Sequence, residues 1–99
     1  MLTRIVKMEF NPSNTEAFLA HFETVKSTIR SFPGCTFLQL YRDQNDPAIF
    51  FTYSKWEDDT YLQAYRQSAL FKEVWATTKP KFRSKAQAWS VDTLHTVAP

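Results

Sequence analysis

Residues 35–56 read CTFLQLYRDQNDPAIFFTYSKW, and this stretch decides the fold. Residues 35–42 and 48–56 are rich in aromatic, aliphatic and β-branched side chains, which is typical of strands. Between them, residues 43–47 read DQNDP, a run of turn-forming residue types that joins neighbouring antiparallel strands. The stretch therefore predicts a β-hairpin in the middle of the chain.

On the N-terminal side of this hairpin, the sequence predicts a strand and then a helix. In residues 2–10, apolar and β-branched side chains alternate with charged ones, as in a strand. Ser13 and Glu16 have the spacing of a capping box, which predicts the start of a helix. Five apolar residues then recur at helical spacing, namely Phe18, Phe22, Val25, Ile29 and Phe32. Pro33 and Gly34 predict the end of this helix.

On the C-terminal side of the hairpin, the sequence predicts a helix in two parts. Asp58 or Asp59 is suited to cap its first turn. The apolar spacing shifts at Ser68, so we expect one helix up to about Gln67 and a second up to Thr78. The serine at the break can itself cap the second part.

A last strand is predicted over residues 85–93, followed by a loose tail over residues 94–99. The resulting order, strand–helix–strand–strand–helix–strand, predicts an α+β fold of the ferredoxin-like βαββαβ type. In this sandwich the helices cover one face of a four-stranded antiparallel sheet. Because no repeat or linker interrupts the sequence, we expect a single domain over residues 1–99 with its core at about 2–93.

Large apolar side chains fall on both faces of the predicted sheet. In residues 48–56, Phe51 and Tyr53 face one way, whereas Phe50 and Trp56 face the other. A sheet covered by helices on one side needs apolar residues on that side only. We therefore expect a homodimer in which two copies pack through their sheet faces.

The composition excludes several classes of function. The single glycine, Gly34, excludes P-loop and dinucleotide-binding motifs, which need several glycines. A net charge of +2 gives no reason to expect nucleic acid as a partner. No apolar run is long enough to span a membrane, and the N-terminal residues do not resemble a signal peptide.

The cysteine and histidine content bears on compartment and on metals. The lone Cys35 cannot form an intrachain disulfide, which favours a reducing compartment and predicts a cytoplasmic protein. His21 and His95 are far apart, and no cluster of Cys, Asp or Glu has metal-ligand spacing. We expect neither a metal nor another cofactor.

Aromatic residues make up 16 % of the chain, and several gather around the second helical region. Trp56, Tyr65 and Trp75 are suited to form the walls of a flat, apolar pocket for a planar aromatic ligand. The alternative is that these side chains simply fill the core. His21 lies just outside the apolar face of the first helix, where it either makes a local hydrogen bond or contacts a ligand and moves a proton.

Several segments together resemble the antibiotic biosynthesis monooxygenase (ABM) family, a group of dimeric α+β barrels. They are residues 4–7 (RIVK), 32–35 (FPGC), 51–57 (FTYSKWE) and 65–71 (YRQSALF), and the likeness covers about residues 2–93. The resemblance implies the ferredoxin-like fold and dimerisation through the sheets. Some members of the family oxidise polycyclic phenols, anthrones or quinols with O₂ and no cofactor, and others degrade haem that is held by a histidine.

The resemblance also implies roles for individual residues. Trp75 stands where the haem-degrading members have their histidine, so that ligand role does not carry over to this chain. Tyr65 falls where those members place an aromatic residue, and Trp56 matches a pocket tryptophan of the oxygenases.

The hypothesis from the sequence is a cofactor-independent monooxygenase that acts on a small aromatic molecule of quinol type. Its predicted catalytic residues are Tyr65 and His21, and the predicted substrate-binding residues are Trp56, Trp75, Phe22, Phe71 and Arg66. The alternative is a non-catalytic homodimer of the same fold that binds, carries or senses a small molecule.

Overall fold

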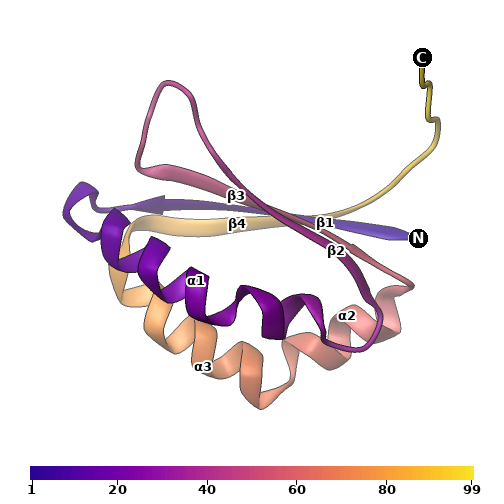
Figure 1. Ribbon diagram of the computed structural model, residues 1–99, viewed down its shortest axis with the longest axis horizontal. Helices are drawn as coiled ribbons and strands as arrows, with labels where there is room; N and C mark the ends of the chain where they lie inside the picture. The colour runs from indigo at the N-terminus through magenta and orange to yellow at the C-terminus, as the bar shows by residue number, and fades with distance from the viewer.

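The computed structural model describes residues 1–99 and has four strands and three α-helices (Figure 1). In chain order, the elements are β1 (Leu2–Phe10), α1 (Thr15–Arg30), β2 (Cys35–Arg42), β3 (Ile49–Trp56), α2 (Asp59–Arg66), α3 (Ala69–Thr78) and β4 (Phe82–Asp92). Short 3₁₀ turns precede α1 and follow α3, over Pro12–Asn14 and Lys79–Lys81.

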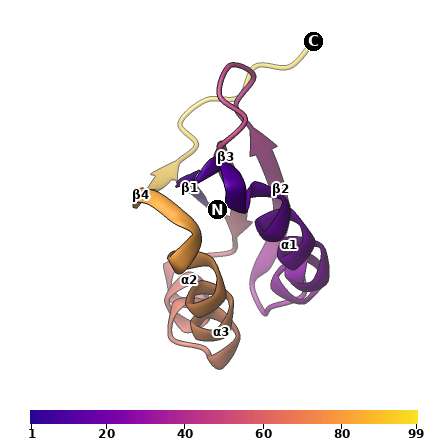
Figure 2. The ribbon, with the colours of Figure 1, turned by 90° about the vertical axis from the view of Figure 1, so that its left-hand side faces the viewer.

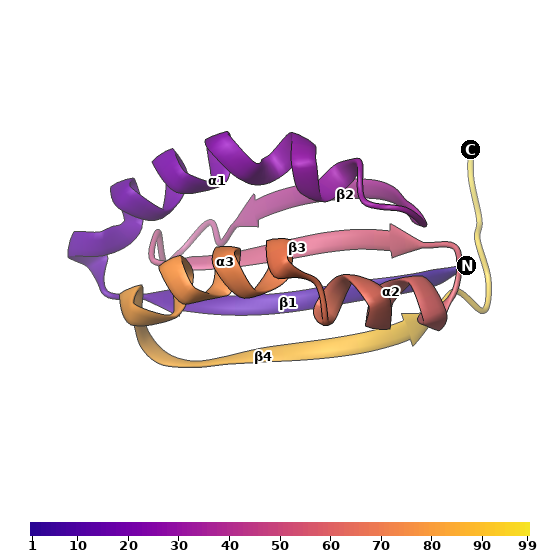
Figure 3. The same cartoon turned by 90° about the horizontal axis from the view of Figure 1, so that it is seen from below.

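The strands form one antiparallel sheet in the order β2-β3-β1-β4. All three helices lie on the same side of this sheet, with α1 under β2 and the pair α2 and α3 beside it (Figures 2 and 3). The predicted α+β, ferredoxin-like architecture is therefore confirmed, including the helices on one face and the break in the second helix. No helix has the length and apolar character that crossing a membrane requires.

The start of α1 differs from the predicted capping box. Ser13 lies within the 3₁₀ turn, α1 begins at Thr15, and no side chain caps the first turn. Instead, the hydroxyl of Thr15 donates to the carbonyl of Pro12 at 3.1 Å. Proline suits the first position of a helical turn, so the chain begins to coil at Pro12, and Ser13 is no longer in the extended conformation of a cap.

The two predicted caps of the later helices are present. Asp58 accepts hydrogen bonds from the backbone N–H groups of Thr60 at 2.8 Å and Tyr61 at 3.3 Å. The hydroxyl of Ser68 accepts from the N–H of Phe71 at 3.1 Å and donates to the carbonyl of Tyr65 at 2.6 Å. Ser68 therefore ends α2 and begins α3 with one hydroxyl group.

The last strand begins at Phe82, three residues before the predicted start at Lys85. The ring of Phe82 packs on that of Phe10, with the ring centres 5.2 Å apart. The cations Lys79, Lys81, Arg83 and Lys85 are typical of a solvated loop, but Phe82 lies among them, is partly buried and packs against the cluster that contains Phe10.

Two clusters of buried side chains hold the helices on the sheet. One lies at the end of β1 and contains Met8, Phe10, Phe18 and Phe50. The other lies at the start of β1, where Leu2 pairs with Trp56, and contains Cys35, Trp56 and Leu62. The middle of the helix–sheet interface lies between these clusters.

The sheet face opposite the helices, here called the open face, is rich in apolar side chains. On it, Ile5 pairs with Tyr53 on one side and with Trp89 on the other, and Tyr41 pairs with Phe51. The side chain of Trp89 is 45 % exposed, and that of Tyr41 is 44 % exposed. The open face therefore carries large apolar side chains, as the sequence pattern predicts, with Lys7, Gln39 and Lys55 among them.

The turn between α1 and β2 gives a test of the fold. Gly34 has φ +85°, and a Cβ added there would lie 2.2 Å from Cγ of Tyr61. We expect Gly34→Ala to lower the free energy of unfolding by about 1–3 kcal/mol, because it adds both backbone strain and a clash. Urea denaturation followed by circular dichroism measures this loss.

A double variant separates the two causes of that loss. Gly34→Ala combined with Tyr61→Ala removes the clash and keeps the strained backbone, so it should be more stable than expected from the sum of the single changes. An unchanged urea midpoint for Gly34→Ala alone would contradict the description of this turn.

Candidate functional site

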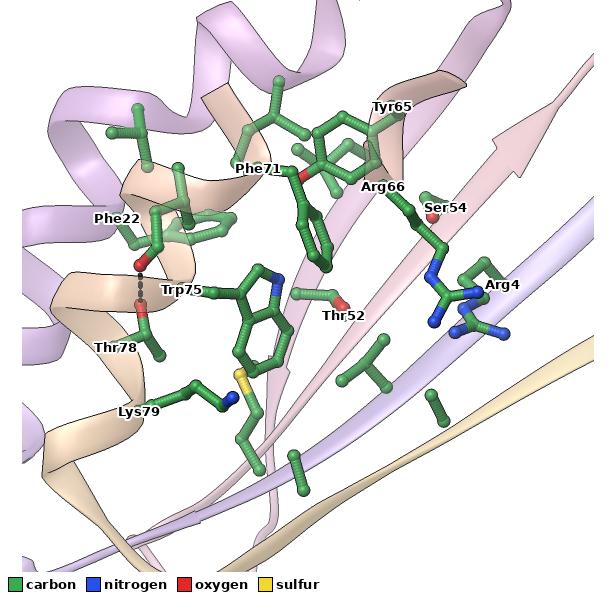
Figure 4. A pocket seen from close by; sticks show the side chains of 18 of the residues that line it. Arg4, Phe22, Thr52, Ser54, Tyr65, Arg66, Phe71, Trp75, Thr78 and Lys79 are labelled. Atoms are coloured by element: carbon green, nitrogen blue, oxygen red, sulfur yellow. Dashed lines mark hydrogen bonds between the residues drawn. The ribbon is translucent and has the colours of Figure 1, made fainter. Parts of the chain in front are cut away.

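A cavity of about 370 Å³ lies between the helices and the middle of the sheet (Figure 4). It is lined by 22 residues, of which 15 are hydrophobic. A volume in this range suits a small organic ligand with two or three fused rings, and a mostly apolar lining with a few polar groups is typical of ligand sites.

The cavity exists because the sheet carries small side chains at its centre. Thr52 and Ser54 of β3 and Ala86 and Ala88 of β4 point toward the helices and form its floor. The neighbouring positions of the same face on β3 carry the large side chains of the two buried clusters. The side chains of the floor therefore extend less far toward the helices than those of the two clusters. The helices rest on the clusters and leave a space above the floor.

One side of the cavity is a chain of four aromatic rings, here called the aromatic wall. Its ring centres are separated by 5.1 Å from Trp56 to Tyr65, 5.2 Å from Tyr65 to Phe71 and 5.7 Å from Phe71 to Trp75. Trp56 is 1 % exposed, and its indole N–H donates to the hydroxyl of Ser54 at 3.0 Å. The planes of successive rings meet at 27°, 83° and 44°, so the packing fixes each ring but the wall as a whole is angular.

Tyr65 combines a fixed ring with a free hydroxyl. Its ring stacks on Trp56 and meets the edges of Phe32 and Phe71. The hydroxyl makes no hydrogen bond within the chain, and the side chain points toward the cavity (Figure 4). Burial, with a smaller effect of the Cys35 thiol, raises the pKa of Tyr65 to about 12. The hydroxyl therefore stays protonated at neutral pH and is available as a hydrogen-bond donor.

His21 reaches the cavity from α1, where it is half-buried beside Phe22. Its backbone carbonyl accepts from the hydroxyl of Thr24 at 2.6 Å, but its imidazole has no hydrogen-bond partner in the chain. The imidazole is thus not held by the local hydrogen bond that the sequence left open as one reading. It is the only imidazole in the lining of the cavity.

All residues that the sequence singled out for the site line this one cavity. They are Tyr65, His21, Trp56, Trp75, Phe22, Phe71 and Arg66. Their common location is a geometric fact, whereas their roles in binding or catalysis stay predictions.

Sequence reasoning did not assign five polar residues of the lining to the site, namely Arg4, Thr52, Ser54, Thr78 and Lys79. Arg4 shares the helix-facing side of β1 with Val6 and Met8, and its Nη1 donates to the hydroxyl of Ser90 at 3.0 Å. The signal for Arg4 was the alternation along β1, which places every even residue of that strand toward the helices. Lys79 follows the end of α3 and begins a run of alternating cations over residues 79–85, which the sequence presents either as a solvated loop or as a rim that attracts anions.

No group of three or more His, Cys, Asp or Glu side chains is placed to hold a metal ion. Cys35 is buried, which raises the pKa of its thiol. A buried thiol of raised pKa is a poor nucleophile.

Comparison with known proteins was made by sequence and by structure. The sequence matches the family model described as antibiotic biosynthesis monooxygenase (ABM) over residues 1–77. A search of curated proteins found no match.

Solved structures resemble the chain over nearly its whole length. An antibiotic biosynthesis monooxygenase has a TM-score of 0.90 at 21 % identity, over 96 % of this chain and 100 % of that one. A protein from Mycobacterium tuberculosis has a TM-score of 0.87 at 14 % identity, over 98 % of each chain. A protein from Pseudomonas aeruginosa has a TM-score of 0.83 at 20 % identity, over 95 % of this chain and 94 % of that one.

At such low identities, the structural likeness establishes the fold alone. The family model rests on sequence and spans β1 to α3, which includes the aromatic wall and most of the cavity lining. The chain therefore belongs to the antibiotic biosynthesis monooxygenase (ABM) family.

Proposed function

We propose that the protein is a cofactor-independent monooxygenase that oxidises a small, planar aromatic molecule of quinol or anthrone type with O₂. The observation that carries this proposal is an apolar cavity whose rigid aromatic wall presents one unpartnered, protonated tyrosine hydroxyl. Such a site can hold a planar ring, exclude water and stabilise negative charge on a ring oxygen.

The proposed reaction needs little from the protein, because the substrate itself supplies the electrons. Loss of a proton from an anthrone or quinol gives an electron-rich anion, which passes an electron to O₂. A bond then forms between a ring carbon and oxygen, and the O–O bond of the resulting peroxide breaks. For the methylene carbon of an anthrone, one oxygen atom remains as a carbonyl and the other leaves as water. The substrate loses four electrons and O₂ gains four, so no further reductant is needed.

Six of the seven predicted site residues, all except Arg66, have a role in this reaction. Histidine is the side-chain base suited to neutral pH, so His21 would take the proton from the substrate. The hydroxyl of Tyr65 would donate a hydrogen bond to the ring oxygen on which negative charge develops. Trp75, Phe71 and Phe22 would hold the ring. Trp56 would position Tyr65, because stacking on Trp56 fixes the plane of the tyrosine ring.

We also propose that two copies pair through their open faces. The support is the group of apolar side chains around Ile5, Tyr53 and Trp89, which has no helix to cover it. An exposed patch of this kind favours association with an identical surface. The lone buried thiol of Cys35 favours a reducing compartment, so we place the homodimer in the cytoplasm.

Oxygen uptake tests the proposed reaction. With an anthrone as substrate and no added flavin, metal or nicotinamide, we expect one O₂ consumed per product formed. Tyr65→Phe should lower kcat about 100-fold with little change in KM, because the lost hydrogen bond acts mainly on charge that develops during the reaction.

A second tyrosine provides the control for that experiment. Tyr61→Phe removes the same atom from a side chain of α2 that does not line the cavity, and it should leave kcat unchanged. Binding of the anthrone without any oxygen uptake would contradict the proposed activity and leave a carrier or sensor.

The dependence of stability on pH tests the environment of Tyr65. The pKa of Tyr65 is about 12 in the folded chain, above its ordinary value of 10.0. The unfolded chain loses this proton first, so the stabilising contribution is complete below about pH 10 and is lost as the pH rises to about 12. Over this range the wild type should lose about 2–3 kcal/mol more than Tyr65→Phe, as measured by urea denaturation. Parallel curves for the two proteins would contradict the buried position of the hydroxyl.

Light scattering tests the homodimer. Phe51→Lys places a charge on the open face and should convert a dimer of about twice 11.6 kDa to a monomer, or prevent soluble expression. Thr28→Lys adds the same charge on the exposed surface of α1 and should leave the dimer intact. A wild-type monomer at micromolar concentration would end this proposal without affecting the proposed reaction.

A further inference from the structure

The charged residues of the cavity are all cations. Arg4, Arg66 and Lys79 line it, and none of its 22 lining residues is an aspartate or a glutamate. The neutral quinol or anthrone considered above accounts for the aromatic wall but not for this excess of positive charge. Arg66 and Lys79 are exposed to water, whereas Arg4 is half-buried, and a cation partly removed from water is costly unless a partner compensates it.

Arg4 is the most confined of these cations. It projects from β1 toward the helices and is half-buried, and the hydroxyl of Ser90 is its one hydrogen-bond partner. Burial lowers the pKa of Arg4, and the nearby charge of Arg66 lowers it further, against a smaller opposite effect of the Asp59 carboxylate. Arg4 stays protonated, but its charge is poorly solvated and faces a like charge.

Arg66 comes to the same end of the cavity from the last turn of α2. Its Nη1 donates only to the side-chain carbonyl oxygen of Gln63, at 3.3 Å. The guanidinium groups of Arg4 and Arg66 are neighbours in the close view of the cavity (Figure 4). Neither arginine forms an ion pair. The ion pairs of the chain join Lys26 to Glu23, and Arg83 to Glu9 and Asp46.

The cavity thus has a cationic end at the two arginines and an aromatic body along Phe71 and Trp75. Two guanidinium groups present planar sets of N–H donors, which match the two oxygens of a carboxylate. A planar aromatic ring can pack against the individual rings of Phe71 and Trp75, which both line the cavity. The two features together describe a ligand with one charged end and one planar apolar end.

We propose that the ligand of this cavity is an aromatic carboxylate, with its carboxylate between Arg4 and Arg66 and its ring against Phe71 and Trp75. This inference rests on the proposed function, because it names the class of aromatic substrate that the same site takes. The carboxylate does not react. It orients the ring and relieves the repulsion between the two arginines.

A pair of matched probes tests the inference. 2-Naphthoate and 2-naphthamide have the same ring and nearly the same shape, but only the first is charged at pH 7. Titration calorimetry, or quenching of tryptophan emission, gives the two dissociation constants. We expect the wild type to bind 2-naphthoate about 10-fold more tightly than 2-naphthamide, because hydrogen bonds to an ionised acceptor are the stronger ones.

Variants assign this preference to the arginines. Arg4→Gln and Arg66→Gln should each reduce the preference to about 2-fold or less and leave the affinity for 2-naphthamide within about 2-fold of wild type. Lys26→Gln removes an exposed cation of α1 outside the cavity and should keep the full preference. Arg66 is exposed, so its variant remains informative even if Arg4→Gln does not fold.

The possible results separate this inference from the proposed function. Equal binding of the two probes by the wild type, or a preference that survives in the arginine variants, overturns the carboxylate assignment and leaves the oxygenase proposal standing. Failure of both probes to bind overturns the carboxylate assignment and also the claim that the cavity receives planar aromatic molecules. Binding as expected without oxygen uptake from an anthrone supports the ligand class and contradicts the oxygenase.

Discussion

Packing of aromatic rings at the two ends of the helix–sheet interface sets the distance between the layers. At one end Phe10 and Phe18 stack with ring centres 4.3 Å apart, and at the other Trp56 and Tyr65 stack at 5.1 Å. Each such pair contributes about 0.5–1.5 kcal/mol beyond its buried area. Because these large rings hold the helices away from the sheet, the small residues between them cannot be reached, and the cavity is the consequence. The same packing that stabilises the fold creates the site.

The secondary structure was predictable because strands and helices leave a period in the sequence. Alternation identified the first strand, the aromatic and β-branched content identified the two hairpin strands, and the shift in apolar spacing at Ser68 located the break between α2 and α3. The start of α1 was not predictable from its capping pattern, because Pro12 favoured an earlier turn over the cap by Ser13. The capping box at Ser13 and the proline at position 12 favour different starts of the helix, and the sequence does not show which start forms.

The site was only partly predictable, for a different physical reason. Aromatic side chains attract attention in a sequence, so Trp56, Tyr65 and Trp75 were identified, whereas a small residue such as Thr52 looks ordinary in any strand. Thr52 matters because its small side chain leaves space between the sheet and the helices. Such space depends on how the two layers pack, which the sequence of one strand does not show. Arg4 was taken only as one of the charged residues of an alternating strand, although its even position in β1 points it toward the helices.

The single hydroxyl of Ser68 has a consequence for how the aromatic wall is assembled. Tyr65 and Phe71 are six residues apart. In one continuous helix, their side chains would point in directions about 120° apart around the helix axis. The break capped by Ser68 resets the helical phase, so that the two rings meet edge to face at 5.2 Å. One residue added or removed at this joint would rotate Trp75 by about 100° relative to Tyr65 while the sheet stayed the same. In evolution, the shape of the cavity can therefore change through the length of one short linker, independently of the sheet and of the open face.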